Sequence, residues 1–278
     1  MSGHIEGAWV TLLTNPDYLM GVKALRNSMK RIGTRYPLVV MVTSRVDVSI
    51  RRELSASGCE VQDVDSLGPP RHLVTNYVYS RFAEVWTKLR VFGLTEYQRV
   101  VYLDADMLLL RDMDELFTTP FAPGERIAAV SDCLCNPDGV SMNIAQRGPE
   151  NCPYTDHSTP KLDHRTRYFN AGLIVLSPDT GLFAGLVDYL ANRDDMASYK
   201  FAEQDLLNEY LANQWHPLPY TYNALTKISE THSGMWSIND VRNLHFAQEK
   251  PWKIDPSTLD DSHPQSALFA TWWQIYES

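Results

Sequence analysis

Apolar runs alternate with amphipathic segments over the first third of the chain. A first apolar run ends in a polar turn at 14–17, and from Tyr18 onward apolar side chains recur at helical spacing. The elements predicted from this pattern are strands at 8–13, 37–43 and 59–64 and helices at 18–32 and 48–57. Their β-α-β order predicts parallel strands in one sheet with helices on both faces, and such sheets bind ligands beyond the carboxyl ends of their strands.

The remainder of the chain continues as strands and helices around one long polar segment. The elements predicted here are helices at 80–93, 112–117, 180–192 and 201–213 and strands at 99–110, 127–131, 173–176 and 241–244. Residues 133–167 are rich in Pro, Gly, Asn, Asp and His and show little periodicity. We interpret them as a loop that lies over the ligand-binding edge of the sheet, and the alternative is a disordered insertion.

Two carboxylates interrupt an apolar run in the middle of the chain. Residues 99–110 are rich in Val and Leu, as expected for a strand buried on both faces, but they include Asp104 and Asp106. Because buried, unpaired charges are costly, we interpret the two aspartates as a metal-chelating pair where the strand emerges into a site. In the alternative interpretation, the strand ends at Leu103 and the aspartates only turn the chain.

Composition and charge narrow the class of protein. The chain has 278 residues, of which 44% are hydrophobic and 21% charged, as expected for a soluble globular protein of one large or two closely integrated domains. A net charge of -9 argues against nucleic acid or an anionic membrane surface as the main partner. No apolar stretch reaches the length of a membrane span and residues 1–7 lack the apolar core of a signal peptide, so we expect a cytoplasmic protein.

The cysteines are few and predict no disulfide scaffold. The chain has four of them and no Asn-x-Ser/Thr sequon, so a secretory history is not indicated. Cys133 and Cys135, together with Cys152 and His157, could be considered zinc ligands, but their spacing fits no common zinc finger. We interpret the cysteines as reduced structural thiols.

Several polar side chains fall where predicted strands end or helices begin. Thr14 and Asn15 follow the first strand, and His245 ends the last one, where the acidic pair makes a ligand role as plausible as a structural one. Lys88 belongs to a solvated helix face on spacing alone, unless it points back over the sheet. Residues 203–205 place two carboxylates and an amide in the first turn of a helix, where they can bind a ligand or simply cap the helix. The chain has no G-x-G-x-x-G and no P-loop, which disfavours a dinucleotide dehydrogenase or a P-loop kinase.

These residues together form a set of motifs that resembles a known enzyme family. The motifs, in chain order, are Leu12-x-Thr14-Asn15-x-x-Tyr18, Thr87-Lys88-Leu89, Asp104-Ala105-Asp106, Phe169-Asn170-Ala171-Gly172, Glu203-Gln204-Asp205, and His245 followed by Lys250-Pro251-Trp252. In this order they resemble family 8 glycosyltransferases over nearly the whole chain. Within that family the galactinol synthases are the most similar group, on Ser131-Asp132-Cys133-x-Cys135 and Trp272-Trp273-x-Ile275-Tyr276, and glycogenin is the next relative.

The resemblance implies a GT-A fold, which is a Rossmann-like α/β fold with a mixed central sheet and helices on both faces. Residues 1–278 would form a single glycosyltransferase domain. Nucleotide-sugar binding would lie mainly in 1–132 and the acceptor and catalytic part mainly in 133–252, with a carboxyl-terminal tail at 253–278.

The resemblance also assigns residues to ligands. A divalent cation, usually Mn²⁺, would be held by Asp104, Asp106 and His245. A UDP-sugar would be the donor, with its nucleotide held by Leu12, Thr14, Asn15, Tyr18 and Ala105 and its diphosphate contacted by Lys250. The donor sugar would be surrounded by the candidate catalytic residues Lys88, Asp132, Asn170, Glu203 and Gln204. An oxygen-rich site with one imidazole suits Mn²⁺, and the cation would stabilise the charge that develops on departing UDP.

The reaction implied is transfer of a hexose with retention of its anomeric configuration. A front-face mechanism would use a UDP phosphate oxygen to take the acceptor proton, with Gln204 or Asn170 steadying the sugar, whereas a double displacement would need Glu203 or Asp205 as a nucleophile. The expected donor is UDP-galactose and the expected acceptor is myo-inositol, without nucleic acid or membrane as a partner; a homodimer is compatible with the sequence. The alternatives are a UDP-glucose or UDP-N-acetylglucosamine transferase, with self-glycosylation as in glycogenin as one form of it, and a non-catalytic nucleotide-sugar binding protein.

Two departures from the family pattern concern the nucleotide site. The acidic motif has Ala105 at its centre, where plant galactinol synthases usually have glycine, and the segment between His245 and Lys250 is shorter than in these relatives.

A strand followed by Asp-x-Asp also suggests a haloacid-dehalogenase-type phosphatase. Met107 and Leu108 replace the small and hydroxylated residues which that fold requires, so we disfavour this class.

Overall fold

A seven-stranded sheet forms the centre of the fold, in the order β3-β2-β1-β4-β7-β6-β8. The computed structural model describes residues 6–73, 75, 77, 84–135, 148–149, 152–155, 168–259 and 263–278. The strands of this sheet are β1 (Gly7–Leu13), β2 (Leu38–Val42), β3 (Glu60–Asp63), β4 (Arg99–Leu103), β6 (Ile127–Ser131), β7 (Phe169–Leu176) and β8 (Trp215–Leu218). The neighbouring strands pair in parallel except at β7, which runs antiparallel to both β4 and β6.

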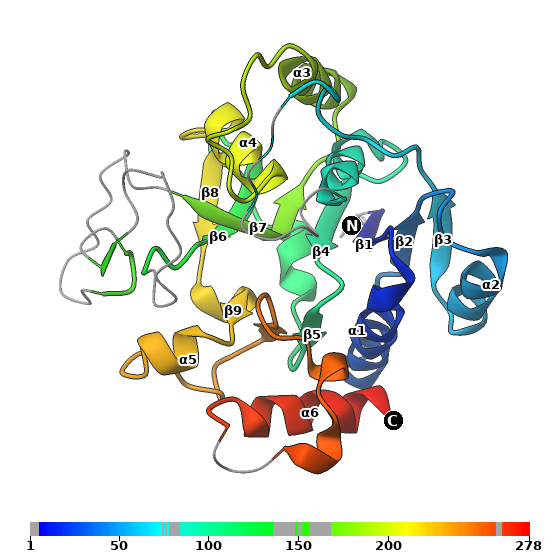
Figure 1. The fold of residues 1–278 in the computed structure, drawn as a ribbon, viewed down its shortest axis with the longest axis vertical. Helices are drawn as coiled ribbons and strands as arrows, with labels where there is room; N and C mark the ends of the chain where they lie inside the picture. The colour runs from blue at the N-terminus through cyan, green and yellow to red at the C-terminus, as the bar shows by residue number, and fades with distance from the viewer. Residues whose placement is uncertain are drawn as a thin grey trace, which may run out of the picture.

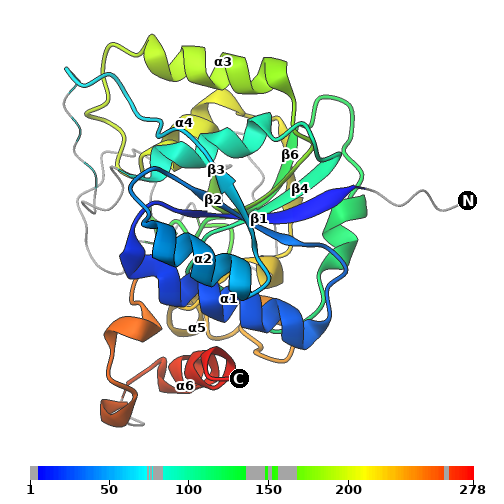
Figure 2. The same cartoon turned by 90° about the vertical axis from the view of Figure 1, so that its right-hand side faces the viewer.

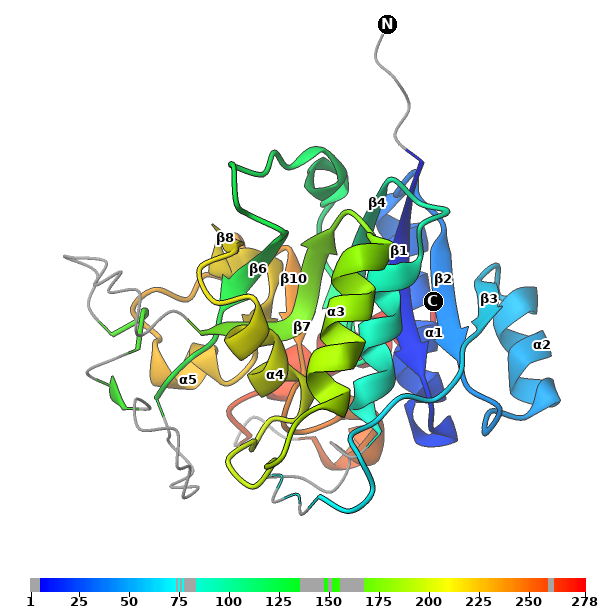
Figure 3. The same cartoon turned by 90° about the horizontal axis from the view of Figure 1, so that it is seen from above.

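Helices cover both faces of the sheet, as predicted (Figure 2). One face carries α1 (Leu19–Ile32) and α2 (Val48–Ala56), and the other carries η3 (Val85–Gly93), α3 (Thr180–Ala191) and α4 (Glu203–Tyr210). Because successive side chains of a strand point to opposite faces, Val10 of β1 packs in the core under η3 and α3, whereas Trp9 packs in the core under α1. Figure 3 shows the same layers from above, with α3 in front of the strands and α1 behind them.

A second, smaller sheet extends the fold on the α1 side. It has the order β5-β10-β9 and consists of β5 (Met107–Leu109), β10 (Asn243–His245) and β9 (Ala224–Leu225). The carboxyl-terminal helix α6 (Ser266–Tyr276) lies beside α1 (Figure 1), and the Asn27 side chain donates hydrogen bonds to the carbonyl oxygens of Ile275 and Tyr276. Leu108, Leu244 and Trp272 share the apolar core between this sheet and α6. The expected tail therefore includes a packed helix.

The remaining elements are short. They are η1 (Pro16–Tyr18), η4 (Asp114–Thr118), η6 (Tyr220–Tyr222), α5 (Ile228–Thr231), η7 (Pro251–Lys253) and η8 (Pro256–Thr258). Among the described residues, no helix combines the length and the apolar character needed to cross a membrane. Most of the predicted loop at 133–167 lies outside the described residues, so its expected role stays a prediction.

Two predicted elements differ from those in the structure, and both differences have a physical reason. The predicted strand at 99–110 is two strands, because the chain turns at 104–106 and enters the second sheet as β5. The segment 85–93, expected to be part of an α-helix, forms the 3₁₀ helix η3, and most of its predicted first turn lies outside the described residues. In both places long-range packing overrides a local pattern, since Leu103 and Leu89 are fully buried in different cores.

The direction of β7 brings the site residues to one edge of the sheet. The parallel strands β1, β4 and β6 end at this edge, at Leu13, Leu103 and Ser131. Because β7 runs the other way, it begins there, and Ser131 pairs with Phe169. The pairing between β6 and β7 shifts its register between Ala129 and Val130, as in a β-bulge.

Candidate active site

The acidic motif 104–106 forms a turn that joins the two sheets. The backbone N–H of Asp104 donates to the carbonyl of Gly172 in β7 (2.8 Å), and the N–H of Phe246 donates to the carbonyl of Asp106 (3.0 Å). Helix α1 approaches the same turn, since a β-carbon on Gly21 would lie 2.3 Å from the carbonyl oxygen of Ala105. The turn is therefore held from three sides, and only glycine at position 21 allows α1 to come this close.

Asp106 is buried between two cationic or basic side chains. Only 7% of the residue is exposed, its Oδ2 lies 2.5 Å from Nζ of Lys250, and its Oδ1 lies 3.3 Å from Nε2 of His245. Burial disfavours the carboxylate, but the Lys250 ammonium, joined by His245 when its imidazole is protonated, outweighs burial and holds the pKa of Asp106 well below its usual range. The Asp106 side chain is therefore an anion.

The protonation of His245 follows from a chain of hydrogen bonds. The N–H of Gly172 donates to Oδ1 of Asn170 (3.0 Å), so this atom is an oxygen and also accepts from Nδ2 of Asn223 (2.9 Å). The other end of the Asn223 amide is then its oxygen, which lies 2.8 Å from Nδ1 of His245. An oxygen there requires a proton on Nδ1, and in a neutral imidazole the lone pair is left on Nε2.

When the imidazole of His245 is neutral, the atoms that face each other between Asp106 and His245 are both electron-rich. Nε2 of His245 then presents a lone pair to Oδ1 of Asp106, and among the described residues this buried oxygen has no hydrogen-bond donor. One ligand atom from each of Asp104, Asp106 and His245 lies within 4.8 Å of the other two. A buried carboxylate oxygen without a donor is costly, and a cation held between these groups would satisfy it. The residues present thus fit a divalent metal ion.

Gly172 forms the wall behind His245. A β-carbon at this position would lie 2.5 Å from Cε1 of His245 and 2.8 Å from Cε of Met107. Real β-carbons do not approach other heavy atoms so closely, so the imidazole has its position only because residue 172 is glycine.

Lys88 is buried at the centre of a second charged group. Its Nζ lies 2.9 Å from Oδ1 of Asp104 and 2.7 Å from Oε1 of Glu203, and it donates to the carbonyl of Ala171 (3.2 Å). Burial lowers the pKa of Lys88, but Asp104 and Glu203 raise it above its ordinary value. The expectation of a solvated helix face is wrong for this lysine, which is 3% exposed and points back over the sheet because its helix is flanked by Trp86 and Leu89 in the core.

Glu203 has an unusual titration for a carboxyl group. Burial, together with the nearby charge of Asp104, raises its pKa to about 7 against the opposing effect of Lys88. Tyr102 adds a hydroxyl that donates to Oδ1 of Asp104 (3.0 Å). The group therefore couples one metal-ligand candidate, Asp104, to the first residue of α4.

Asp132, Asn170 and Gln204 form a third polar group. Nε2 of Gln204 donates to Oδ2 of Asp132 (3.2 Å), and Nδ2 of Asn170 lies 3.4 Å from Oδ1 of the same carboxylate. The Gln204 oxygen accepts the N–H of Ala171 (2.9 Å), which fixes the orientation of the amide. Since Asn170 also connects to His245 through Asn223, this group is continuous with the metal-ligand candidates.

A strained residue directs the start of α4 into the site. Ala202 is fully buried and has a φ of 49°, in the left-handed region that non-glycine residues rarely adopt. Asp205 accepts the N–H groups of Lys200 (2.6 Å) and Phe201 (2.7 Å), so it caps the turn before the helix. Of the three polar residues expected to bind or to cap, Glu203 and Gln204 thus face the site and Asp205 caps.

The residues expected to hold the nucleotide lie at the end of β1. Leu12 is in the strand, Thr14 and Asn15 follow it, and Asn15 accepts the N–H of Asp17 (3.0 Å) to cap η1. The Tyr18 ring packs against that of Trp252 with centroids 5.5 Å apart. Their contacts with a nucleotide stay a prediction.

Lys250 is held at the metal-ligand candidates by backbone oxygens. Its Nζ donates to the carbonyls of Phe246 (2.6 Å) and Ala247 (2.8 Å), within the short segment between His245 and Lys250. A diphosphate bound at Asp106 would therefore meet a preplaced ammonium group.

Four further residues shape the site, and the sequence did not indicate these residues. Tyr102 and Tyr168 donate to Asp104 and Asp205, Asn223 orients His245, and Gly21 admits α1 to the acidic turn. Gly172 had a signal, because it belongs to a quoted motif. Asn223 had none, since its partners lie 22 and 53 residues away.

Comparison with known proteins agrees with this arrangement. The family model described as glycosyl transferase family 8 matches residues 9–255. The chain belongs to this family. It is therefore a hexosyltransferase, and as a family 8 enzyme it acts on a nucleotide-sugar donor and an acceptor.

Named relatives in the family are plant enzymes. The chain is 32% identical over 273 residues to galactinol synthase 1 of Solanum lycopersicum, covering 97% of this chain and 81% of that protein. It is 30% identical over 285 residues to galactinol synthase 6 of Arabidopsis thaliana, covering 98% of this chain and 81% of that protein.

Solved structures place the chain in the GT-A fold, as predicted. The galactosyltransferase LgtC, solved in complex with donor and acceptor sugar analogues, superposes with a TM-score of 0.60 at 14% identity, covering 97% of this chain and 95% of that one. The bifunctional glycosyltransferase WbbM superposes with a TM-score of 0.64 at 19% identity over 100% of this chain, which spans 52% of that one.

Proposed function

We propose that this family 8 enzyme transfers galactose from UDP-galactose to a hydroxyl of myo-inositol, with retention of the anomeric configuration. The similarity to galactinol synthases at 32% and 30% identity over nearly the full chain supports this donor and acceptor. UDP-glucose is the competing donor, because galactose and glucose differ only at C4 and the same residue types can surround either sugar.

The contact between Asp106 and His245 carries the catalytic part of the proposal. Oδ1 of Asp106, for which the described residues supply no donor, lies 3.3 Å from Nε2 of His245, the nitrogen that carries the lone pair in the neutral imidazole. This is a place for a cation, and Asp104, Asp106 and His245 would hold Mn²⁺ there. When bound, the metal ion supplies positive charge that stabilises the departing UDP.

The side chains of the enzyme would support the same charge separation. Lys250, 2.5 Å from Asp106, would exchange one of its oxygen partners for a diphosphate oxygen. Asp132, Asn170 and Gln204 would accept and donate hydrogen bonds to the donor sugar, where a bond to the C4 hydroxyl distinguishes galactose from glucose. Lys88 would fix Asp104 and Glu203 in place around it.

The first turn of α4 favours a front-face mechanism. A double displacement needs a carboxylate free to attack the anomeric carbon. Glu203 is paired with Lys88 at 2.7 Å, and Asp205 accepts two backbone N–H groups. Both candidate nucleophiles are therefore occupied, and we assign the acceptor proton to a phosphate oxygen of UDP, with Gln204 beside the sugar as it gains oxocarbenium character.

A donor and acceptor screen tests the proposal. Hydrolysis of UDP-galactose and UDP-glucose is compared at equal Mn²⁺, and transfer to myo-inositol is followed by mass spectrometry of the product. We expect faster turnover of UDP-galactose and a hexosyl-inositol product. Faster turnover of UDP-glucose without an inositol product would overturn the assignment, and a mass increase of the enzyme itself would identify a self-glycosylating transferase.

A further inference from the structure

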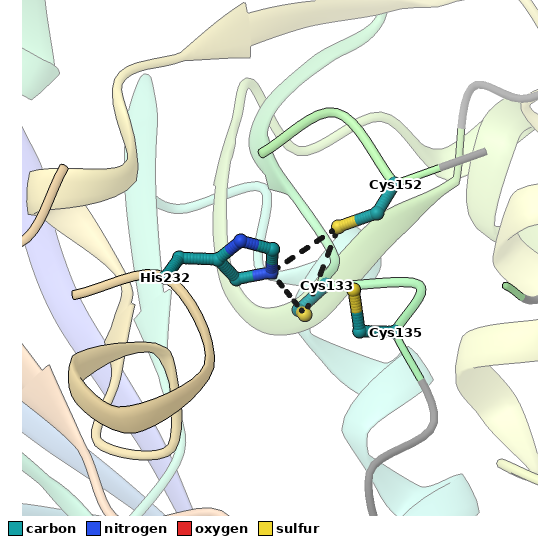
Figure 4. A group of neighbouring side chains, drawn as sticks. All are labelled: Cys133, Cys135, Cys152 and His232. Atoms are coloured by element: carbon teal, nitrogen blue, oxygen red, sulfur yellow. Dashed lines mark hydrogen bonds between the residues drawn. The ribbon is translucent and has the colours of Figure 1, made fainter. Parts of the chain in front are cut away.

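Three cysteines and a histidine from distant parts of the chain meet at one point. Cys133 and Cys135 follow β6, Cys152 lies further along the same connection, and His232 directly follows α5. One atom from each, three Sγ and one imidazole nitrogen, lies within 4.8 Å of the others. Figure 4 shows the four side chains converging, with the Nε2 edge of His232 directed at the sulfur atoms.

The separations among Cys133, Cys152 and His232 match the edges of a coordination tetrahedron. Sγ of Cys133 lies 3.8 Å from Sγ of Cys152, and Nε2 of His232 lies 3.3 Å and 3.5 Å from these two sulfurs. With Zn–S bonds near 2.3 Å and Zn–N bonds near 2.0 Å, a tetrahedral zinc ion places its ligands about 3.8 Å apart for two sulfurs and about 3.5 Å for sulfur and nitrogen. Three of the four atoms therefore already have the spacing of zinc ligands, and Sγ of Cys135 lies within 4.8 Å of them.

The surroundings hold the four side chains in this arrangement. Cys152 and His232 are buried, the Tyr154 ring packs edge-on against the imidazole at 5.8 Å, and the Tyr154 hydroxyl donates to the carbonyl of Ser131 (2.5 Å).

We propose that Cys133, Cys135, Cys152 and His232 bind a structural Zn²⁺ ion. Four protein ligands leave no open position, which is typical of structural rather than catalytic zinc. Thiolate sulfur also separates this site from the oxygen-rich group at Asp104 and Asp106, which suits harder ions.

The position of the site gives the ion a role in the architecture. Cys133 directly follows Asp132, whose carboxylate contacts Asn170 and Gln204. His232 belongs to the segment that follows β9 and Asn223, the residue that orients His245. A zinc ion would tie the connection after β6 to this segment and so restrict the position of Asp132.

A disulfide is the competing explanation for two of the cysteines. The sulfurs of Cys133 and Cys152 are 3.8 Å apart, whereas a disulfide bond is about 2.05 Å long. All four cysteines of the chain are thiols in the structure. A disulfide would also leave the approach of Cys135 and His232 to the same point unexplained.

Metal analysis of the full chain tests the proposal. The protein is purified without chelator, incubated with ZnCl₂, desalted and analysed by mass spectrometry for metals. We expect one zinc per chain in the wild type and in Cys59→Ser, because Cys59 lies in a different core, and loss of zinc in Cys152→Ser and His232→Ala. Asp106→Asn should keep its zinc, which separates this site from the proposed manganese site.

Cobalt provides a second readout that does not depend on the variants folding. Wild-type protein stripped of metal and loaded with Co²⁺ should show the sulfur-to-cobalt charge-transfer and tetrahedral d–d bands of a thiolate site. The inference is overturned if wild-type protein retains neither zinc nor cobalt, if its cobalt spectrum lacks thiolate bands, or if its intact mass is lower by two hydrogens, as in a disulfide.

Discussion

Gly172 and His245 are packed so closely that a β-carbon on the glycine would lie 2.5 Å from Cε1 of the imidazole. Neither residue can move independently, because the Gly172 carbonyl accepts the N–H of Asp104 and Nδ1 of His245 is bonded to Asn223. The backbone of β7 therefore helps to fix the positions of the proposed metal ligands Asp104 and His245.

Gly172→Ala should displace His245 while leaving the fold intact. The added methyl group would push the imidazole away from Asp106, and we expect the apparent affinity for Mn²⁺ to fall roughly 10- to 100-fold, as when support for a metal ligand is lost. Activity as a function of Mn²⁺ concentration measures the effect. Gly68→Ala is the control, since a β-carbon at Gly68 would meet none of the described residues within 4 Å. Equal effects in both variants would contradict the assignment.

Asp106→Asn should preserve the fold and abolish most turnover. The substitution keeps the shape of the side chain but removes the charge that faces His245 and Lys250, so turnover should fall by at least about 10²-fold. Differential scanning fluorimetry gives a second measurement, in which Mn²⁺ with UDP should raise the melting temperature of the wild type more than either alone, and should not do so in the variant. Asp65→Asn on the exposed surface serves as the control. Identical UDP affinity of the wild type with Mn²⁺ and with chelator would rule out the metal site.

Asn223→Ala should weaken metal binding, although Asn223 is not one of the proposed metal ligands. Its oxygen holds the proton on Nδ1 of His245, so its loss should free the imidazole to rotate and lower the apparent Mn²⁺ affinity roughly 10- to 100-fold. Asn223→Asp keeps an acceptor for the imidazole and should recover much of this affinity. If the two variants behave alike, Asn223 only fills space. Mn²⁺ titration of UDP-sugar hydrolysis distinguishes these cases.

Glu203 should make the stability of the protein depend on pH. Burial raises its pKa from 4.5 to about 7, so the folded chain holds a proton where the unfolded chain has lost it. The resulting stabilisation is complete below about pH 4.5 and is lost as the pH rises through about 7. The free energy of unfolding of the wild type should therefore fall relative to that of Glu203→Gln over this range.

Urea unfolding of both proteins at several pH values measures this difference. Glu277→Gln, at an exposed position, should track the wild type throughout. A constant difference between wild type and Glu203→Gln across the range would show that Glu203 does not titrate there.

The sequence predicts elements well where a periodic pattern and a stop signal coincide. The helix expected at 48–57 is Val48–Ala56, followed by Gly58 in the left-handed conformation, and the helix expected at 180–192 is Thr180–Ala191. The metal-ligand candidates Asp104, Asp106 and His245 also come together as expected. Local pattern and charge cost were sufficient for the helices and for the pairing of Asp104 with Asp106, whereas the inclusion of His245 rested on the resemblance to family 8 glycosyltransferases.

What the sequence could not supply are contacts between distant segments. The burial of Lys88 depends on Glu203, 115 residues later. The cysteine group is joined by His232, which the sequence did not indicate, and His157 lies outside the described residues. The antiparallel direction of β7 could not be predicted either. Its residues are all buried, so their hydrophobic pattern is the same for a parallel and an antiparallel strand. When the partner of a charged or sulfur-containing side chain lies far along the chain, no local sequence pattern reveals the contact.

The register shift between β6 and β7 makes the length of this stretch of chain as important as its composition. Ala129 pairs with Ile174, and the next residue of β6, Val130, pairs with Asn170. Residues 171–173 of β7 therefore lie opposite the single peptide bond between Ala129 and Val130. Removing one of them would turn Asn170 to the opposite face of the sheet and separate its side chain from both Asp132 and Asn223. Variation among enzymes of this architecture should then proceed here by exchange of side chains, with insertions and deletions confined to segments away from this strand.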